Sequence, residues 1–363
     1  MSITFYTVIL ARVEPGSRVT IRDVAARAGV SVATVSKVIN NRYGVASGTQ
    51  ARVQAVIEEL GYEASLVAQS LRNQRTNVIG ILVADLEPVS TELLKGAADA
   101  IRGSGFELVV YSAGGHSGDR AGWERRYLSR LSGTLIDGAI LVAPTVVDVT
   151  YGAPVVAIDP HTGQSGLPTV DCDNLRGARL ATGHLLSLGH RRIAMLTGRP
   201  GLESAQLRER GYREALHAAG VAVDESLIGR GGHDPGVSLE QARLLLTAPG
   251  PPTAVFAAND LSAIATIEAA AELGLRVPAD LSVVGFDNIP ESALCAPPLT
   301  TVEQPIRKMG ERSIELLLAL LRGEKAQATH ITLATSLVIR QSTRARRPDP
   351  GPDGPDGGPA GRA

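Results

Sequence analysis

The segment from Asp23 to Asn40, DVAARAGVSVATVSKVIN, carries side chains that could contact a nucleic acid. In its second half Val35, Val38 and Ile39 fall on one helical face. The opposite face presents small, polar and singly basic side chains, namely Val32, Ala33, Ser36 and Lys37. Hydroxyl groups can bond phosphates, a lysine can address guanine O6 and N7, and small apolar groups can touch a thymine methyl. These residue types predict a helix that enters the major groove of DNA.

A preceding helix must hold this one in place. Thr20 followed by Asp23 is a capping box that opens a helix through Ala28, and Gly29 can end it in the left-handed geometry that glycine tolerates. Ser31 is then expected to cap the second helix. Two short helices joined by a tight Gly-Val turn predict a helix-turn-helix.

A third helix and an excess of positive charge accompany this pair. Ser47 and Gln50 are expected to form another capping box, for a helix that ends at Gly61. From Ser17 to Arg75 there are eight basic and four acidic residues, a net charge of +4, whereas the whole chain carries −1. A small helical core without a ligand is the alternative interpretation. The exposed polar face and the local positive charge favour contact with DNA phosphates.

From Val78 onward, short apolar runs alternate with helical patterns. The runs are 78–83, 106–110, 138–142, 154–158, 192–196, 253–257 and 281–285. Such alternation predicts an α/β fold with parallel sheets, in two lobes of roughly 78–175 and 176–340 with a ligand cleft at the carboxyl ends of the strands. The predicted organisation is an extension at 1–17, the helix-turn-helix domain at 18–64, a hinge helix and linker at 65–77, a two-lobed domain at 78–343 and a Pro/Gly-rich tail at 344–363.

Composition excludes several classes of protein. With 44% hydrophobic and 20% charged residues, the 363-residue chain reads as globular, and the apolar stretch near its start is too short to span a bilayer. Cys172, Cys295 and seven scattered histidines show no metal-ligand spacing, so neither a metal nor a cofactor is expected. No phosphate-binding loop or nucleophile motif argues for an enzyme. We expect a cytoplasmic protein that does not contact a membrane.

Several longer stretches are similar to one family of proteins. They read VTIRDVAARAGVSVATVSKVINN, VASGTQARVQAVIEELGYEAS, AQSLRNQRTNVIGILVADL, DNLRGARLATGHLLSLGHRRIAMLTG, FAANDLSAIATIEAAAELGLRVPADLSVVGFDN and PPLTTVEQPIRKMGERSIELLL. Over roughly residues 18–345 the chain resembles the LacI/GalR family of bacterial transcriptional regulators. The resemblance implies a two-lobed domain like that of periplasmic sugar-binding proteins, a homodimer, and a small-molecule effector that controls affinity for double-stranded operator DNA.

The resemblance also implies roles for particular residues in DNA binding. Val32, Ala33 and Lys37 would read bases, and Leu71 would be the hinge-helix leucine that wedges into the minor groove, with Ala68 beside it. The remaining expected DNA contacts are Thr20, Ser31, Thr34, Ser36 and Asn40. The family often has Pro-Asn where this chain has Ala64-Ser65. Ser65 can still cap the hinge helix, but we expect Ala64-Ser65 to define the start of that helix less sharply than Pro-Asn does. The alternative for Leu71 is a linker residue packed on its neighbours.

Four polar residues match the ligand-contacting positions of the family. They are Asp159, Arg208, Asn259 and Asp287, and Asp85 at the end of the first strand could join them. Carboxylates accept paired hydroxyl hydrogen bonds, and Arg and Asn donate or bridge them, so this set suits a polyol. The alternative for each is a loop residue that caps a neighbouring helix.

The identity of the ligand is the least determined point. Where many relatives carry two aromatic residues, this chain has residues 87–90, EPVS, with Ser90 as a candidate contact. Trp123 could stack on a sugar, or it could be a core residue. A carbohydrate is the first choice, and a nucleobase or another metabolite is the alternative. A solute-binding receptor of the same fold is the competing function. Such a receptor would need an export signal, and it would have no use for a helix-turn-helix.

Overall fold

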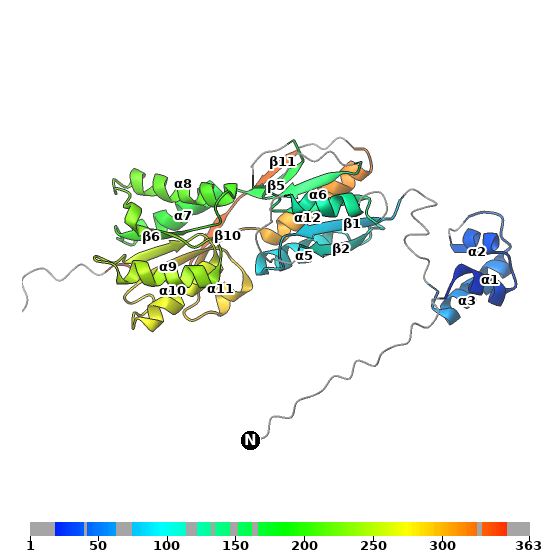
Figure 1. The fold of residues 1–363 in the computed structure, drawn as a ribbon, viewed down its shortest axis with the longest axis horizontal. Helices are drawn as coiled ribbons and strands as arrows, with labels where there is room; N and C mark the ends of the chain where they lie inside the picture. Colours follow the sequence, from blue (N-terminus) through cyan, green and yellow to red (C-terminus); the bar gives the residue numbers. More distant parts are fainter. Residues whose placement is uncertain are drawn as a thin grey trace, which may run out of the picture. The chain divides into compact units, whose positions relative to one another are not determined.

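The computed structural model describes residues 19–39, 42–62, 75–113, 122–131, 135–145, 152–161, 166–324 and 329–346. The chain divides between Thr76 and Asn77 into two compact units (Figure 1). Within the described residues, none of the helices has the length and apolar character needed to cross a membrane.

The described part of the first unit forms three helices around a small core. They are α1 (Ile21–Ala28), α2 (Val32–Ile39) and α3 (Ser47–Leu60). Each helix contributes one valine that is completely buried: Val24, Val35 and Val53. The predicted apolar face of α2 is confirmed, because Val38 is buried beside Val35.

The ends of α1 and α2 follow the expected caps. The Asp23 carboxylate accepts hydrogen bonds from the backbone amide of Thr20 at 2.8 Å and from its hydroxyl at 2.7 Å. Gly29 ends α1 with a φ of 65°, in the left-handed region. The amide of Thr34 donates to the Ser31 hydroxyl at 3.1 Å, so Ser31 caps α2 as predicted.

The start of α3 differs from the sequence prediction. Ser47 is the first residue of the helix and not its cap, which is Ala46. The amides of Thr49 and Gln50 donate to the Ala46 carbonyl at 2.9 and 3.0 Å, and no side chain caps the helix. The predicted capping box of Ser47 and Gln50 is therefore wrong by one residue, because backbone bonds satisfy the first turn.

The second unit contains two six-stranded sheets, each covered by helices. The first sheet, in the order β11-β5-β4-β3-β1-β2, is parallel throughout. Its strands are β1 (Val78–Val83), β2 (Glu107–Ser112), β3 (Gly138–Val142), β4 (Val155–Ile158), β5 (Thr169–Cys172) and β11 (His330–Leu333). With α5 (Pro88–Ala100), α6 (Trp123–Leu131) and α12 (Ile306–Leu321), this sheet makes up the first lobe.

The second lobe surrounds the sheet β12-β10-β9-β8-β6-β7, in which β12 runs antiparallel to β10 and the other described pairs are parallel. Its strands are β6 (Ile193–Thr197), β7 (Ile228–Arg230), β8 (Ala254–Ala257), β9 (Ser282–Asp287), β10 (Thr300–Glu303) and β12 (Ser336–Val338). The helices are α7 (Asn174–Ser187), α8 (Glu203–Ala218), η1 (Glu225–Leu227), α9 (Pro235–Thr247), α10 (Asp260–Glu272) and α11 (Pro290–Leu294). Parallel α/β sheets of this kind place loops at the carboxyl ends of their strands, where ligands bind.

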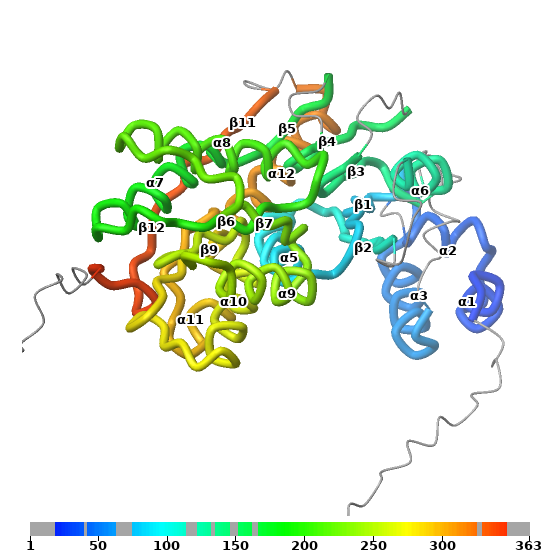
Figure 2. Tube along the Cα trace, turned by 60° about the vertical axis from the view of Figure 1, so that its left-hand side comes forward, coloured from blue at the N-terminus to red at the C-terminus, as the bar shows by residue number. Residues whose placement is uncertain are grey.

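The lobes are not contiguous in sequence, contrary to the predicted division into 78–175 and 176–340. After β10 the chain returns to the first lobe, where α12 packs on α5 and β11 pairs with β5 (Figures 1 and 2). It then crosses back, and β12 pairs with β10 in the second lobe. The pattern of alternating strands and helices could not reveal these crossings, because it does not say which sheet a strand joins.

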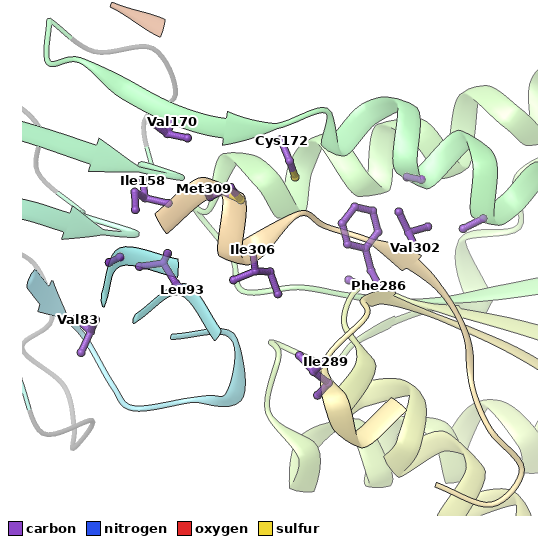
Figure 3. Packing of buried hydrophobic residues seen from close by; sticks show 14 of the residues in the cluster. Val83, Leu93, Ile158, Val170, Cys172, Phe286, Ile289, Val302, Ile306 and Met309 are labelled. Carbon is purple, nitrogen blue, oxygen red and sulfur yellow. The ribbon is translucent and has the colours of Figure 1, made fainter. Parts of the chain in front are cut away.

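Two glycines allow α12 to lie very close to α5. A methyl group at Gly96 would overlap the carbonyl oxygen of Arg307, and one at Gly310 would overlap the carbonyl of Leu93. The helix backbones are therefore in direct contact, which fixes the end of the first lobe that faces the cleft. In Figure 3, Ile306 and Met309 of α12 lie between first-lobe residues and Phe286 of β9, and all belong to one hydrophobic core.

Candidate DNA-binding helix and ligand cleft

The outward face of α2 is formed by the residues that the sequence predicted. Ala33 and Lys37 are exposed, Val32 is 39% exposed, and Ser36 is partly exposed. The hydroxyl groups of Ser31 and Thr34 lie 2.9 Å apart at the start of the helix. This face is small and polar, so a helix backbone can approach a nucleic acid closely.

Further exposed side chains flank α2 that sequence reasoning did not single out. Arg22 on α1 and Arg42 after α2 are exposed, and Tyr43 has a completely exposed side chain. Arg27, in contrast, pairs with Glu59 at 2.6 Å and ties α1 to α3. Only the local excess of basic residues signalled this surface in the sequence.

Three of the expected DNA contacts lie outside the described residues: Asn40, Ala68 and Leu71. Thr20 is exposed, but its hydroxyl donates to Asp23, so its first role is to cap α1.

The second unit has a cavity of about 120 Å³ between its lobes. Asp159, Arg208, Asn259 and Asp287, the four predicted ligand contacts, all line it, and so does Ser90. Asp85 is exposed and lines an adjoining hollow of about 70 Å³. The other polar lining residues, which the sequence reasoning missed, are Glu87, Arg199, Ser204, His233 and Gln304.

Arg208 is the centre of the cleft and is only 4% exposed. Its Nε donates to Asn174 Oδ1 at 2.9 Å, and its Nη2 donates to Gln304 Oε1 at 2.8 Å. Nη1 donates to the Ala258 carbonyl at 2.5 Å and to Asp287 Oδ1 at 3.2 Å. The guanidinium group also stacks over the ring of Phe286, 3.7 Å from its centroid. The side chain is thus locked before any ligand arrives.

The two cleft carboxylates have unusual conformations and protonation. Burial raises the pKa of Asp287 to about 7, although Arg208 opposes the shift. Burial also raises the pKa of Asp159, again against the charge of Arg208. Asp287 has a φ of 114° and Asp159 a φ of 47°, both in the left-handed region that favours glycine. Residues that combine a strained backbone with a shifted pKa cluster at binding sites.

Asn259 caps a helix, which was the alternative interpretation of this residue in the sequence. It precedes α10, and its Oδ1 accepts the amide of Ser262 at 3.0 Å, so it caps that helix. It also lines the cavity, and an asparagine side chain carries donor groups besides the oxygen that caps the helix. The two interpretations are therefore compatible.

His233 adds an uncommitted polar group to the cavity. It follows β7, and burial lowers its pKa to about 3, so the imidazole is neutral. Its Nε2 is buried and has no hydrogen-bond partner among the described residues. A buried polar atom without a partner is costly unless a ligand or water satisfies it.

An ion pair joins the two lobes at the edge of the cleft. Arg199, which follows β6, lies 3.6 Å from the Glu87 carboxylate, which follows β1. Both residues come from loops at the carboxyl ends of strands, as does Gln304 after β10. A position directly after a strand could have indicated these residues in the sequence. For Gln304 it could not, because strand β10 was not predicted.

Trp123 does not lie in the cleft. It is 3% exposed and packs with Leu128 in a core cluster of the first lobe, with its ring 6.0 Å from that of Tyr127. The expectation that Trp123 stacks on a sugar is therefore corrected: the side chain is buried in the core of the first lobe.

The cleft offers several hydrogen-bonding groups to a ligand. Within the described ranges, the His, Cys, Asp and Glu side chains form no group that could hold a metal ion. Fixed carboxylates, a neutral imidazole and an amide make the cavity suitable for a ligand with several hydroxyl groups.

Comparison with known proteins agrees with both units. Residues 20–65 match the model for "Bacterial regulatory proteins, lacI family", and residues 182–343 match a periplasmic binding protein-like domain. The transcriptional regulator DegA of Bacillus subtilis is 35% identical over 336 residues, which cover 90% of this chain and 98% of DegA.

Solved structures give the same result over the length of the chain. A lac repressor dimer bound to operator and the anti-inducer ONPF has a TM-score of 0.79 and 31% identity, covering 91% of this chain and all of that one. A complex of the regulator CelR with cellobiose has a TM-score of 0.67 and 34% identity, covering 90% and 100%. The chain therefore belongs to the lacI family of bacterial regulatory proteins and is a DNA-binding transcriptional regulator with a small-molecule effector.

Proposed function

We propose that this regulator is a repressor whose dimer reads a near-palindromic operator through α2 and releases it when a small polyol fills the cleft. One observation carries the proposal: α2 exposes Val32, Ala33 and Lys37, while the opposite faces of α1 and α2 are buried in the core of the first unit. A face so small and polar has no packing role in the first unit, and it suits the floor of a major groove.

In this proposal the residues of α2 divide into two groups. Lys37 bonds a guanine and Val32 and Ala33 touch apolar base edges, whereas Ser31, Thr34 and Ser36 bond phosphates. Thr20 and Asn40 make further backbone contacts. Leu71 inserts into the central minor groove with Ala68 beside it. The cost of unstacking one base step is offset because the bent DNA contacts more of the protein surface.

The effector is proposed to be a carbohydrate no larger than a monosaccharide. Among the described residues, those that line the cavity include no Phe, Tyr or Trp, which favours a hydroxyl-bearing ligand over a flat aromatic base. Asp159 and Asp287 accept hydroxyl hydrogen bonds, Arg208 and Asn259 donate them, and Ser90 and Asp85 lie at the first-lobe side. A cavity of about 120 Å³ is small even for a ligand pocket, which disfavours a disaccharide.

Coupling between the two sites follows from unequal affinity. A ligand shifts a conformational equilibrium only by its difference in affinity for the two forms. Contacts to both lobes favour the closed arrangement, and closure would change the spacing of the two hinge segments in the dimer. Induction, with release of the operator, is the proposed direction.

Replacement of Lys37 by Ala tests the DNA half of the proposal. Loss of a good base contact costs about 1–3 kcal/mol of discrimination, so the variant should tolerate any base at one position of each half-site. The measurement is binding to a set of single-base variants of a duplex recovered by the protein from a random pool. Lys308→Ala, at an exposed lysine of the second unit, is the matched control and should behave as the unaltered chain. Equal weakening on every duplex would show that Lys37 only contacts phosphate.

A further inference from the structure

A buried carboxylate beside the cleft is not explained by contact with the ligand cavity. Asp260, the first residue of α10, is completely buried and does not line the cavity. Its Oδ2 accepts the backbone amide of Ile289 at 2.9 Å, and its Oδ1 accepts the hydroxyl of Thr301 at 2.5 Å. Asp260 therefore fixes the chain two residues after Asp287.

The segment that Asp260 fixes has an uncommon backbone. Asp287 and Asn288 have φ values of 114° and 58°, so two successive residues other than glycine adopt the left-handed region. Such conformations persist only where the surrounding structure determines them. The segment 287–289, here called the Asp287 turn, must therefore be held by its neighbours.

Arg340 holds the same turn from another side. Its Nη2 donates to Asn288 Oδ1 at 2.6 Å, and its Nη1 donates to the Leu299 carbonyl at 2.7 Å and to Ser292 Oγ at 3.2 Å. The fork of the guanidinium group thus joins the turn, the start of β10 and α11. Like Asp260, Arg340 is absent from the lining of the cavity.

We propose that Asp260 and Arg340 are positioning residues of the effector cleft: together they hold the Asp287 turn in the form that presents its carboxylate to Arg208 and to the ligand. This inference rests on the proposed function of the cleft. Neither residue touches the cavity, so both act through Asp287. Because Arg340 also bonds Ser292, the same clamp sets the position of α11, whose Leu294 is 83% exposed.

The first test measures ligand affinity with three variants. The probes are D-ribose, D-xylose, D-glucose and D-galactose, titrated by calorimetry against Arg340→Ala, Arg340→Lys and the surface control Arg276→Ala, whose arginine is 77% exposed. Arg340→Ala should weaken the binding of the sugar that the unaltered protein accepts by about tenfold, the effect of losing partly buried hydrogen bonds from a charged group. Arg340→Lys keeps the charge but loses the fork, so it should recover part of that loss.

Operator binding without sugar separates positioning from simple destabilisation. All three variants should bind the selected duplex as the unaltered protein does, because the Asp287 turn lies in the other unit. Loss of sugar affinity, operator affinity and melting temperature in step would mean that Arg340 only supports the fold, and would overturn the proposal.

A second measurement does not depend on the ligand. Cys295 follows α11, is partly exposed, and its thiol donates to the carbonyls of Ser292 and Pro297, whereas Cys172 is buried. Arg340→Ala and Asp260→Asn should each raise the rate at which iodoacetamide modifies Cys295 several-fold, and Arg276→Ala should leave it unchanged. If sugar affinity and Cys295 reactivity are both unaltered in Arg340→Ala, the clamp does not exist.

Failure of the cleft assignment would give a different result. If a sugar binds equally well to Arg208→Ala, the ligand site lies elsewhere and the proposed function of the cleft is wrong. If no sugar of the set binds, the effector class is wrong, and the rate of Cys295 modification alone decides whether Asp260 and Arg340 hold the turn.

Discussion

The helix-turn-helix unit and the ligand cleft place their functional side chains in opposite environments. On α2 the candidate contacts Val32, Ala33 and Lys37 are exposed, whereas Arg208 and Asp287 are 4% and 5% exposed and bond to each other. The α2 face is ready to bond a partner and contributes little to folding. The cleft is organised in advance, so a substitution there disturbs folding and ligand binding together.

Two aspartates make the contrast concrete. Asp23 on α1 is fully exposed, and hydrogen bonds from Thr20 lower its pKa. Asp287 is buried, and burial raises its pKa to about 7 despite its ion pair with Arg208. Hydrogen bonding to the charged form lowers the pKa of Asp23 and desolvation raises that of Asp287, so acid changes the stability contributions of these two carboxyl groups in opposite senses.

Replacement of Arg208 by Ala should have the largest effect on the second unit. It removes the four hydrogen bonds of the guanidinium group and leaves their buried partners unsatisfied, which costs about 3–5 kcal/mol of unfolding free energy. Urea unfolding measures this loss, and the surface control Arg276→Ala should change the free energy by no more than about 0.5 kcal/mol. Equal stability of the two variants would contradict the interlocked cleft.

The pH dependence of stability should separate the cleft from the surface. Between the ordinary pKa of 3.8 and the folded value of about 7, the folded chain keeps a proton on Asp287 that the unfolded chain has lost. Stability of the second unit should therefore fall as pH rises through this range, by roughly 2–4 kcal/mol. Asp287→Asn should remove part of this slope in thermal unfolding measured at successive pH values. An unchanged slope in that variant would show that Asp287 is already ionised.

A cavity in the first unit should affect DNA binding alone. Val35→Ala removes two buried methyl groups from a very small core, at a cost of about 2 kcal/mol. A unit of this size has little stability to spare, so operator binding should fall sharply. Ligand binding by the second unit should be unaffected, and Val237→Ala, at a side chain that is 47% exposed, is the control. Loss of both activities would mean that the units do not fold independently.

Removal of the α2 cap should have the smallest effect. Ser31→Ala deletes one hydrogen bond to the amide of Thr34 and should cost about 1 kcal/mol. Thr accepts the same bond, so Ser31→Thr should restore stability. If Ser31→Ala weakened DNA binding but not stability, Ser31 would contact phosphate and the cap would be unimportant.

Local features of the first unit were predictable because they depend on near neighbours. The period of Val35 and Val38, the glycine after α1 and the cap at Ser31 each involve residues within one or two helical turns. The same applies to the strands β1, β3 and β9, whose apolar runs are buried on both faces. Asp159 and Asp287 could be placed because they follow such strands.

The parts that failed depend on contacts between distant segments. Strands β5, β7 and β10 are short and read TVDC, IGR and TTVE, so no apolar run marks them. The return of α12 to the first lobe depends on Gly96 and Gly310, which could not be paired from the sequence. His233 and Gln304 were missed for the same reason: the strands before them were not recognised.

Selection of binding sites from a random pool of duplexes tests the central claim, that the exposed face of α2 reads base sequence. The full chain should recover sites that share an inverted repeat, and Lys37→Ala should lose the preference at one position of each half-site while keeping the spacing. Recovery of duplexes with no shared sequence, bound with the same salt-sensitive affinity as unselected DNA, would contradict the account.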